Sequence, residues 1–378
     1  MPPTVIVRYG ELALKSEPVR RRFEHALISS MKRTLGDLSY DIRVERGRIF
    51  VDTRSMTKVI KRLAQLPGIT SLSPSNRTKA NMDDIRTQAV KYAKKMLKPG
   101  MAFAVRTNRV GKHQFSSRDI NIDIGSSILQ IMKNVHVDLS SPDIAVSIEV
   151  RDEDAYIFVK TVEGVGGLPV GTQGRVVAIF SGTRNDAAAA FLMLKRGCTV
   201  YPLFLNHNDS LNDKTSRRVV SPAKKLTGFG SAGSLWSFPF KEVLTELRKK
   251  SDSRASFYAC RRCALRAAEM VAKRVRAEAI VIGDDAKMIA TQKLANLSSI
   301  DEACKMAVLR PLSGMDEQEI RRTTEKIGFK LSTDLPPLCP PPTGELISLE
   351  ELRTLEKEMN IDAFIVGASK RIKKINLW

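Results

Sequence analysis

The segment at positions 176–197, VVAIFSGTRNDAAAAFLMLKRG, constrains the fold of this chain more than any other stretch. Its short apolar run predicts a buried strand, and the alanine-rich run after Ser181 and Gly182 predicts a helix. Such a strand followed by a helix is typical of a parallel sheet covered by helices on both faces. Further strand-like runs alternate with helical segments at 198–206, 234–240 and 277–283. The chain from Arg175 onward is therefore predicted to be a doubly wound α/β domain.

The turn between that first strand and its helix is a candidate anion-binding loop. The start of a helix presents free N–H groups and the positive end of the helix dipole. Gly182 would let the backbone approach a phosphate closely, and the hydroxyls of Ser181 and Thr183 could donate to its oxygens. The Gly-Lys-Ser/Thr ending of a Walker loop is absent. On this pattern alone, a plain strand–helix turn without a ligand is the alternative.

Two smaller α+β domains are predicted before the α/β domain. Residues 1–75 show a strand, a helix, two strands around Gly47 and a second helix, the order of a ferredoxin-like fold. The next unit holds two helices, the second capped by Ser116 or Ser117, a strand, and a hairpin. The predicted domains are 1–75, 76–168 and 169–378, with the glycine-rich stretch GVGGLPVGTQG at the second boundary.

The charge of the chain favours a polyanionic partner. Lys and Arg number 62 against 41 Asp and Glu, which gives a net charge of +21. Nucleic acid is the first candidate, and a generally basic surface is the alternative. Basic residues that could contact phosphate are Arg20, Arg21, Arg22, Arg106, Arg109, Lys112, His113 and Arg118. Neither a signal peptide nor a membrane span is indicated, so a cytoplasmic location without membrane contact is expected.

The five cysteines are too few and too scattered for a disulfide framework. Cys260 and Cys263 stand three apart near a predicted helix start among arginines, which favours thiolates suited to iron or zinc. A third ligand is needed, and Cys339 in the proline-rich stretch 335–344 is the candidate. Cys304 is expected in a packed helix. The alternative is cysteines without metal, a Cys260–Cys263 disulfide included.

Several stretches together resemble the tRNA 4-thiouridine synthetases, also called tRNA sulfurtransferases. They include VIVRYGELALKS, FAVRTNRVGKHQFSSRDINIDIG, VEGVGGLPVGTQGRV and IGDDAKMIATQKLANL, and the resemblance extends over essentially the whole chain. It implies a ferredoxin-like domain, a tRNA-binding THUMP domain and an adenine-nucleotide α-hydrolase domain with a PP-loop. The implied reaction adenylates a uridine of tRNA with ATP, and sulfur then displaces AMP to give 4-thiouridine. Many members also supply sulfur for the thiazole of thiamine.

The resemblance places the nucleotide site on specific positions. They are Ile179, Phe180, Ser181, Gly182, Thr183, Phe204, Leu205, Arg261, Gly283 and Gln292. The loop departs from the family pattern, because Thr183 replaces a glycine, Asn185 the aspartate and Asp186 a serine. In the family that aspartate helps to manage Mg²⁺ and pyrophosphate. Asp186 points about 100° away around an ideal helix, so it replaces the lost carboxylate only if the helix starts differently.

The resemblance also implies how sulfur is delivered. The catalytic positions are Asn185, Asp186 and Cys339, and the chain, which ends at Trp378, is expected to be the archaeal-type form without a rhodanese domain. Cys260, Cys263 and Cys339 would hold an iron–sulfur cluster with one iron open to sulfide. Expected partners are tRNA and sulfide or a sulfur-donor protein, with a homodimer among the oligomeric states. The alternative is a tRNA-binding THUMP protein whose altered loop has lost or changed catalysis.

Overall fold

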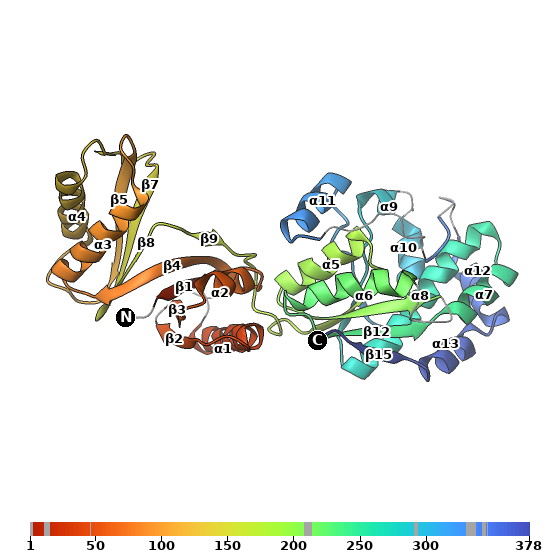
Figure 1. Ribbon diagram of the computed structural model, residues 1–378. Coiled ribbons are helices and arrows are strands. Elements are labelled where there is room, and N and C mark those ends of the chain that lie inside the picture. Colours follow the sequence, from red (N-terminus) through yellow and green to blue (C-terminus); the bar gives the residue numbers. More distant parts are fainter. Residues whose placement is uncertain are drawn as a thin grey trace. The chain divides into compact units, whose positions relative to one another are not determined.

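The computed structural model describes residues 3–10, 16–45, 47–207, 214–290, 294–329, 338–341, 345 and 347–378 (Figure 1). The chain divides into two compact units. Unit 1 holds most residues up to Gly166, and unit 2 holds Gly167–Trp378 together with Ser16–Ser30 and Gln65–Gly68. No helix in the described part of the chain combines the length and apolar character that crossing a membrane requires.

The first part of the chain is a mixed α+β structure. Its elements are β1 (Thr4–Tyr9), α1 (Glu17–Leu35), β2 (Asp41–Glu45), β3 (Arg48–Asp52), α2 (Met56–Leu63), β4 (Ile69–Lys79), α3 (Met82–Met96), β5 (Ala102–Val110), α4 (Ser117–Ile131), β6 (His136–Val137), β7 (Ile144–Arg151), β8 (Asp154–Phe158) and β9 (Val162–Glu163). Its strands form one sheet in the order β2-β3-β1-β4-β8-β7-β5-β6, with β9 paired to β4. The antiparallel order β2-β3-β1-β4 is that of the predicted ferredoxin-like fold.

Strand β4 is the feature that the sequence did not reveal. It runs without a break from Ile69 to Lys79, across the predicted boundary between residues 75 and 76. Its first part pairs with β1 and its last part with β8. The segment ITSLSPSNRTK contains Pro74 and lacks the regular alternation that marks a strand. One strand therefore belongs to both parts of the unit 1 sheet.

Helices α3 and α4 supply the core of the second half of unit 1. The apolar side chains of Ile85, Ile120 and Ile124 are fully buried with those of Phe103 and Ile148 from the sheet. The predicted cap is confirmed: the Ser116 side chain accepts from the Asp119 N–H, and the Asp119 side chain accepts from the Ser116 N–H.

Unit 2 contains the α/β domain. Its elements are β10 (Arg175–Ile179), α5 (Arg184–Lys195), β11 (Thr199–Asn206), α6 (Lys214–Thr227), β12 (Ser234–Pro239), α7 (Lys241–Lys250), α8 (Ser253–Val275), β13 (Ala279–Val281), α9 (Ala286–Ala290), α10 (Leu294–Asp301), β14 (Ala307–Leu309), α11 (Glu317–Lys326), α12 (Leu349–Glu358), α13 (Ile361–Ser369) and β15 (Lys373–Asn376).

The sheet order of unit 2 confirms the predicted doubly wound class. The strands lie in the order β14-β13-β10-β11-β12-β15 and are parallel, except that β15 runs antiparallel to β12. From β10 the chain continues outward through β11 and β12, and it then returns to the other side of β10 through β13 and β14. The carboxyl ends of β10 and β13 thus flank the point where the strand order reverses, which is where open α/β sheets bind their ligands.

Two expectations about the cysteines are wrong. Helix α8 begins at Ser253, where the Asp252 side chain accepts from the Ala255 N–H, so Cys260 and Cys263 lie in the interior of the helix. They therefore lie too far from the helix start for its dipole to favour thiolates, since that effect fades within the first turn. Cys304 follows the end of α10 and lies in a turn instead of a helix.

Candidate active site

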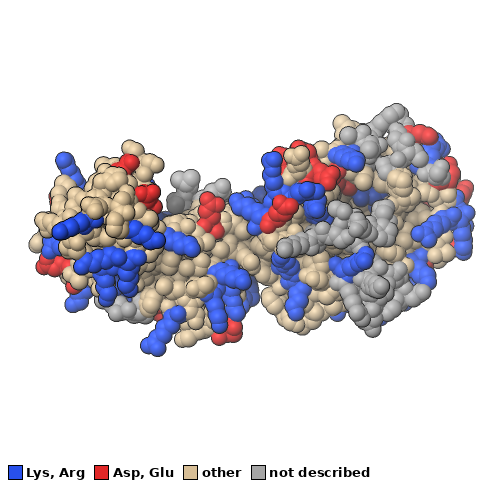
Figure 2. All heavy atoms as spheres, turned by 45° about the horizontal axis from the view of Figure 1, so that its top comes forward, with Lys and Arg blue, Asp and Glu red and all other residues tan. Residues whose placement is uncertain are grey.

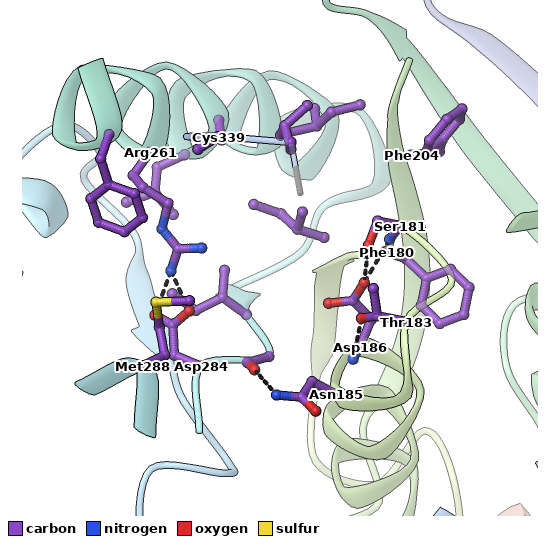
Figure 3. A pocket seen from close by; sticks show the side chains of 18 of the residues that line it. Phe180, Ser181, Thr183, Asn185, Asp186, Phe204, Arg261, Asp284, Met288 and Cys339 are labelled. Atoms are coloured by element: carbon purple, nitrogen blue, oxygen red, sulfur yellow. Dashed lines mark hydrogen bonds and ion pairs between the residues drawn. The ribbon is translucent and has the colours of Figure 1, made fainter. Parts of the chain in front are cut away.

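A pocket of about 400 Å³ opens at the carboxyl ends of β10, β11 and β13 (Figure 3). Helix α8 and the segment 338–341 complete its wall. The predicted residues that line it are Ile179, Phe180, Ser181, Thr183, Asn185, Asp186, Phe204, Leu205, Arg261, Gly283 and Cys339. Gln292 lies outside the described residues. Residues from five separate stretches of sequence thus meet where the sheet topology predicts a ligand.

The loop between β10 and α5 has the geometry of an anion site. Thr183 caps α5, and its side chain accepts from the Asp186 N–H at 3.3 Å. Gly182 has a φ of +89°, which side chains disfavour, and an added Cβ would come within 3.1 Å of the carbonyl oxygen of Arg218 in α6. Glycine is therefore required where the loop turns toward the start of the helix.

The Asp186 side chain stabilises this loop through hydrogen bonds from Ser181. Its Oδ2 accepts from the backbone N–H and from the hydroxyl of Ser181, at 2.8 and 2.5 Å. Burial raises the pKa of the Asp186 carboxyl, and the hydrogen bonds from Ser181 oppose that shift in part. The carboxylate that the sequence offered as a substitute for the missing loop aspartate is thus engaged in holding Ser181.

Asn185 links the loop to the end of β13. Its amide nitrogen donates to Asp285 Oδ2 at 2.9 Å and lies 3.3 Å from the carbonyl oxygen of Gly283. The two segments pack so closely that a Cβ on Gly283 would lie 3.0 Å from the carbonyl carbon of Asn185. Asp285 was not predicted as a site residue, because nothing in the local sequence places it beside Asn185.

Arg261 reaches the pocket from α8 and forms an ion pair with Asp284. Asp284, whose side chain is only 4% exposed, also pairs with Arg310 at 3.3 Å. Arg310 in turn pairs with Asp301 at 2.5 Å. Two arginines and two aspartates therefore neutralise one another on this wall, and they fix the direction of the Arg261 side chain.

The apolar part of the pocket is built by the ends of β10 and β11. Phe180, Phe204 and Leu205 are buried there. His207 follows directly after β11 and also lines the pocket, and its Nδ1 is buried without a hydrogen-bond partner among the described residues. His207 was not predicted as a site residue, although its place just beyond a predicted parallel strand is a signal for one.

The three cysteines predicted as metal ligands form one disulfide-bonded pair and one free thiol. The structure joins Cys260 to Cys339 by a disulfide with a Cα–Cα distance of 5.7 Å, instead of the alternative Cys260–Cys263 bridge. Cys263 is a buried free thiol, and burial raises its pKa to about 12. Among the described residues, no three His, Cys, Asp or Glu side chains are arranged to hold a metal ion.

The basic residues of unit 1 lie at the end of β5 and the start of α4. Arg109 donates to the carbonyl oxygen of Gly111 at 3.1 Å, and the His113 ring lies 2.7 Å from the carbonyl oxygen of Asp152. Arg106, Lys112 and Arg118 are exposed. In the face that Figure 2 shows, Lys and Arg side chains gather over parts of the surface where acidic side chains are few. The other predicted basic residues, Arg20, Arg21 and Arg22, lie on the part of α1 that belongs to unit 2.

Comparison with known proteins places the chain in a family. Its parts match the models of a ThiI ferredoxin-like domain (residues 4–73), a THUMP domain (79–160) and a thiamine biosynthesis protein, ThiI (171–342). A probable tRNA sulfurtransferase of Methanothermobacter thermautotrophicus is 33% identical over 86% of this chain and 84% of its own length. The chain belongs to the tRNA sulfurtransferase family. A second probable tRNA sulfurtransferase, from Methanosarcina acetivorans, is 31% identical over 100% of this chain and 94% of its own.

The similarity to the tRNA sulfurtransferases extends to three dimensions. A solved complex of a 4-thiouridine synthetase with RNA and bound ATP matches this chain with a TM-score of 0.88 at 25% identity, over 100% of both chains. The resemblance drawn from the sequence motifs and the fold class predicted with it are thereby confirmed.

Proposed function

We propose that this tRNA sulfurtransferase uses ATP to adenylate a uridine of tRNA and then replaces the uridine oxygen with sulfur, which gives 4-thiouridine. The observation that carries the proposal is the meeting of the loop before α5 and Cys339 in one pocket. The loop suits a nucleotide and the thiol suits sulfur chemistry. The relatives are tRNA sulfurtransferases, and the solved 4-thiouridine synthetase binds ATP and RNA.

The residues of the pocket fit ATP. The backbone N–H groups at the start of α5 and the hydroxyl group of Thr183 suit its phosphates, whereas the Ser181 hydroxyl donates to Asp186. The apolar surface of Phe204 and Leu205 suits its base, and the ion pair with Asp284 holds the Arg261 side chain in the pocket wall. The volume of about 400 Å³ lies in the range of small-ligand pockets.

Adenylation solves the problem of a poor leaving group. The uridine O4 attacks the α-phosphorus of ATP, and pyrophosphate leaves. A sulfur nucleophile then attacks C4 of the base, and AMP leaves with the former uridine oxygen. In this scheme the N–H groups of the loop stabilise the negative charge that builds on the phosphates. Mg²⁺ would neutralise part of that charge.

The Cys260–Cys339 pair supports a role for Cys339 as the sulfur carrier. The terminal sulfur of a Cys339 persulfide attacks C4, AMP leaves, and the base is joined to Cys339 through an S–S bond. The Cys260 thiolate then attacks the Cys339 sulfur, and 4-thiouridine departs as its thiolate. This step leaves the disulfide that the structure contains. A dithiol reductant restores both thiols, and a sulfur-donor protein renews the persulfide.

The arrangement of the cysteines does not fit a three-cysteine metal site, since two are bonded to each other and Cys263 is a buried, protonated thiol. We derive no step through an iron–sulfur cluster, which stays a prediction from the sequence. Iron and sulfide analysis of anaerobically purified protein tests it. If the cluster is present, the wild-type protein contains both iron and sulfide. Both should be lost from each of Cys260→Ala, Cys263→Ala and Cys339→Ala, and both should remain in Cys198→Ala.

Unit 1 is proposed to bind the tRNA, through the THUMP domain and its basic cluster. The proposal includes the predicted division of the chain into three domains, with boundaries at 75/76 and 168/169. It also includes the assignment of the site residues. A cytoplasmic location, a homodimer and a supply of sulfur for the thiazole of thiamine complete it. The last of these is supported by the name of the matched family model.

Nucleoside analysis of tRNA tests the function. Unmodified tRNA is incubated with the protein, ATP and a sulfur source, digested and analysed for 4-thiouridine. Gly182→Ala should abolish both ATP binding and product formation. Its added Cβ would lie 3.1 Å from the carbonyl oxygen of Arg218, on a backbone with a φ of +89°. Gly314→Ala is the matched control, since nothing lies within 4 Å of its added Cβ. If the wild-type protein binds tRNA, does not bind ATP and forms no thiolated nucleoside, the catalytically inactive alternative is correct.

A further inference from the structure

One polar atom in the wall of the pocket lacks a hydrogen-bond partner. His207 follows directly after β11 and lines the pocket together with Phe204 and Leu205. Its Nδ1 is buried and forms no hydrogen bond with any described residue. A buried polar atom of this kind is costly, because it has given up water and gained nothing in return. In the wall of a ligand pocket, its missing partner is best supplied by the ligand.

The imidazole ring of His207 is held in position by its surroundings. Asn206, the last residue of β11, has a backbone carbonyl oxygen that accepts from the Phe240 N–H at 2.6 Å. The His207 ring meets the Phe204 ring edge to face, with 6.3 Å between the two centroids. Phe204 is itself only 2% exposed. Little conformational entropy is therefore lost when Nδ1 forms a hydrogen bond with a ligand.

The burial of Nδ1 indicates which form of the ring the pocket holds. A neutral imidazole carries its proton on one nitrogen and accepts at the other. Buried N–H groups without an acceptor are rarer in proteins than buried acceptors without a donor. The proton therefore belongs on Nε2, which is not among the buried atoms without a partner, and Nδ1 presents its lone pair. The partner that it requires is a hydrogen-bond donor.

ATP offers two kinds of donor, which are the 6-amino group of adenine and the hydroxyl groups of ribose. The surface beside His207 is apolar and is formed by Phe204 and Leu205. Such a surface suits the flat face of a base better than a sugar. An acceptor next to this surface meets the base at its polar edge. Guanine carries a carbonyl oxygen where adenine carries the amino group, so it would place one acceptor against another.

We propose that His207 selects adenine by accepting, at Nδ1, a hydrogen bond from its 6-amino group. The proposal rests on the proposed function, because it concerns the nucleotide of that same pocket. It supplies a partner for a buried atom that has none among the described residues. A site built to hydrogen-bond one group of its ligand rejects an analogue without that group, since the buried atom then stays unpaired.

Nucleotide analogues combined with variants of His207 test this assignment. His207→Phe keeps a planar ring and removes both nitrogens. His207→Asn keeps an acceptor, because its amide oxygen is as many bonds from the backbone as Nδ1. His136→Phe is the matched control, since His136 is exposed on β6 in unit 1. Calorimetry measures the affinity of each protein for ATP, for purine riboside triphosphate, which lacks the 6-amino group, and for 2′-deoxy-ATP and 3′-deoxy-ATP.

The wild type and His136→Phe should bind ATP about tenfold more tightly than purine riboside triphosphate, the effect of one hydrogen bond to a buried atom. This preference should disappear in His207→Phe and largely remain in His207→Asn. The preference for ATP over each deoxynucleotide should be the same in all four proteins. Each preference is a ratio within one protein, so a general loss of stability does not imitate the result. Thermal unfolding identifies a variant that fails to fold, and His207→Ala then replaces His207→Phe.

An unchanged preference for the 6-amino group in His207→Phe would overturn the proposal. A change confined to a deoxynucleotide would also overturn it, because His207 would then contact the ribose. Loss of thiolation with every nucleotide affinity unchanged would do so as well, because His207 would then act on the uridine. If the adenine preference depends on His207 as expected but the wild type forms no 4-thiouridine, the proposed function fails while the role of His207 stands.

Discussion

The basic side chains of the two units have different electrostatic surroundings. In unit 1, Arg106, Arg109 and Lys112 form no ion pair with a described residue. In unit 2, Arg261 and Arg262 are paired with carboxylates and lie in or beside the wall of the pocket. The free cations attract a distant polyanion, whereas the paired ones hold secondary structures in position. The net charge of the chain therefore gives information about the unpaired basic side chains of unit 1, and none about the paired arginines of unit 2.

The difference matters because salt acts on the two groups unequally. Exposed charges are screened beyond about 8 Å at physiological ionic strength, and buried pairs are screened far less. Removing one partner of a buried ion pair leaves the other charge without a partner and without hydrating water. Such a change therefore destabilises the folded protein strongly.

Removing a buried arginine should have the largest effect. Arg262 is 1% exposed and pairs with Glu356 at 2.7 Å, so Arg262→Met removes two hydrogen bonds to a buried carboxylate and leaves it with Arg266 alone. The free energy of unfolding should fall by about 3–5 kcal/mol, measured by urea denaturation. Arg353→Met, which breaks an exposed pair with Glu302, should cost under about 1 kcal/mol. Equal losses would show that burial does not separate the two classes of arginine.

Salt should separate the two ligands. Raising salt from 50 to 200 mM should weaken tRNA binding about tenfold or more, because each phosphate contact releases counterions. ATP binding in the pocket, where Arg261 is already paired, should change much less. Filter binding and calorimetry measure the two affinities. Equal salt slopes would contradict the contrast between free and paired cations.

The basic cluster of unit 1 should account for part of that slope. Changing Arg106, Arg109 and Lys112 to Ala should lower tRNA affinity and reduce the slope by about two, since each single-strand phosphate contact contributes about 0.7. A triple change of Lys94, Lys95 and Lys98, which are exposed elsewhere in unit 1, removes the same charge. If both triples reduce the slope equally, the cluster has no special role.

The smallest effect concerns Asp186. Because its pKa is raised in the folded protein, Asp186 binds its proton more tightly there, and its contribution to stability is lost as pH rises through the folded-state pKa. Asp186→Asn keeps an acceptor for Ser181 and does not titrate. It should be more stable than the wild type at pH 8, and this difference in the free energy of unfolding should close below about pH 4, near the ordinary pKa of Asp. Thermal unfolding across this pH range measures the gap, and a constant or reversed gap contradicts the raised pKa.

The sequence by itself determined the local features. The apolar run before Ser181 and the helix after it, the cap at Ser116 and the strand–helix alternation of unit 2 all follow from the spacing of neighbouring side chains. The loop residues were predictable for the same reason, because strand, turn and helix are contiguous. Strand β4 was missed because its pattern is irregular, and its role depends on two partner strands.

Only the tertiary structure decided which distant residues meet. Asn185 and Asp285 are brought together because β13 returns to the side of β10, and Cys339 reaches Cys260 from a segment 79 residues away. The sequence named both Asn185 and the cysteines but could not choose their partners. The physical reason is that periodicity records which side of an element is buried, whereas the pairing of remote elements depends on the order of strands and on the packing of the whole domain.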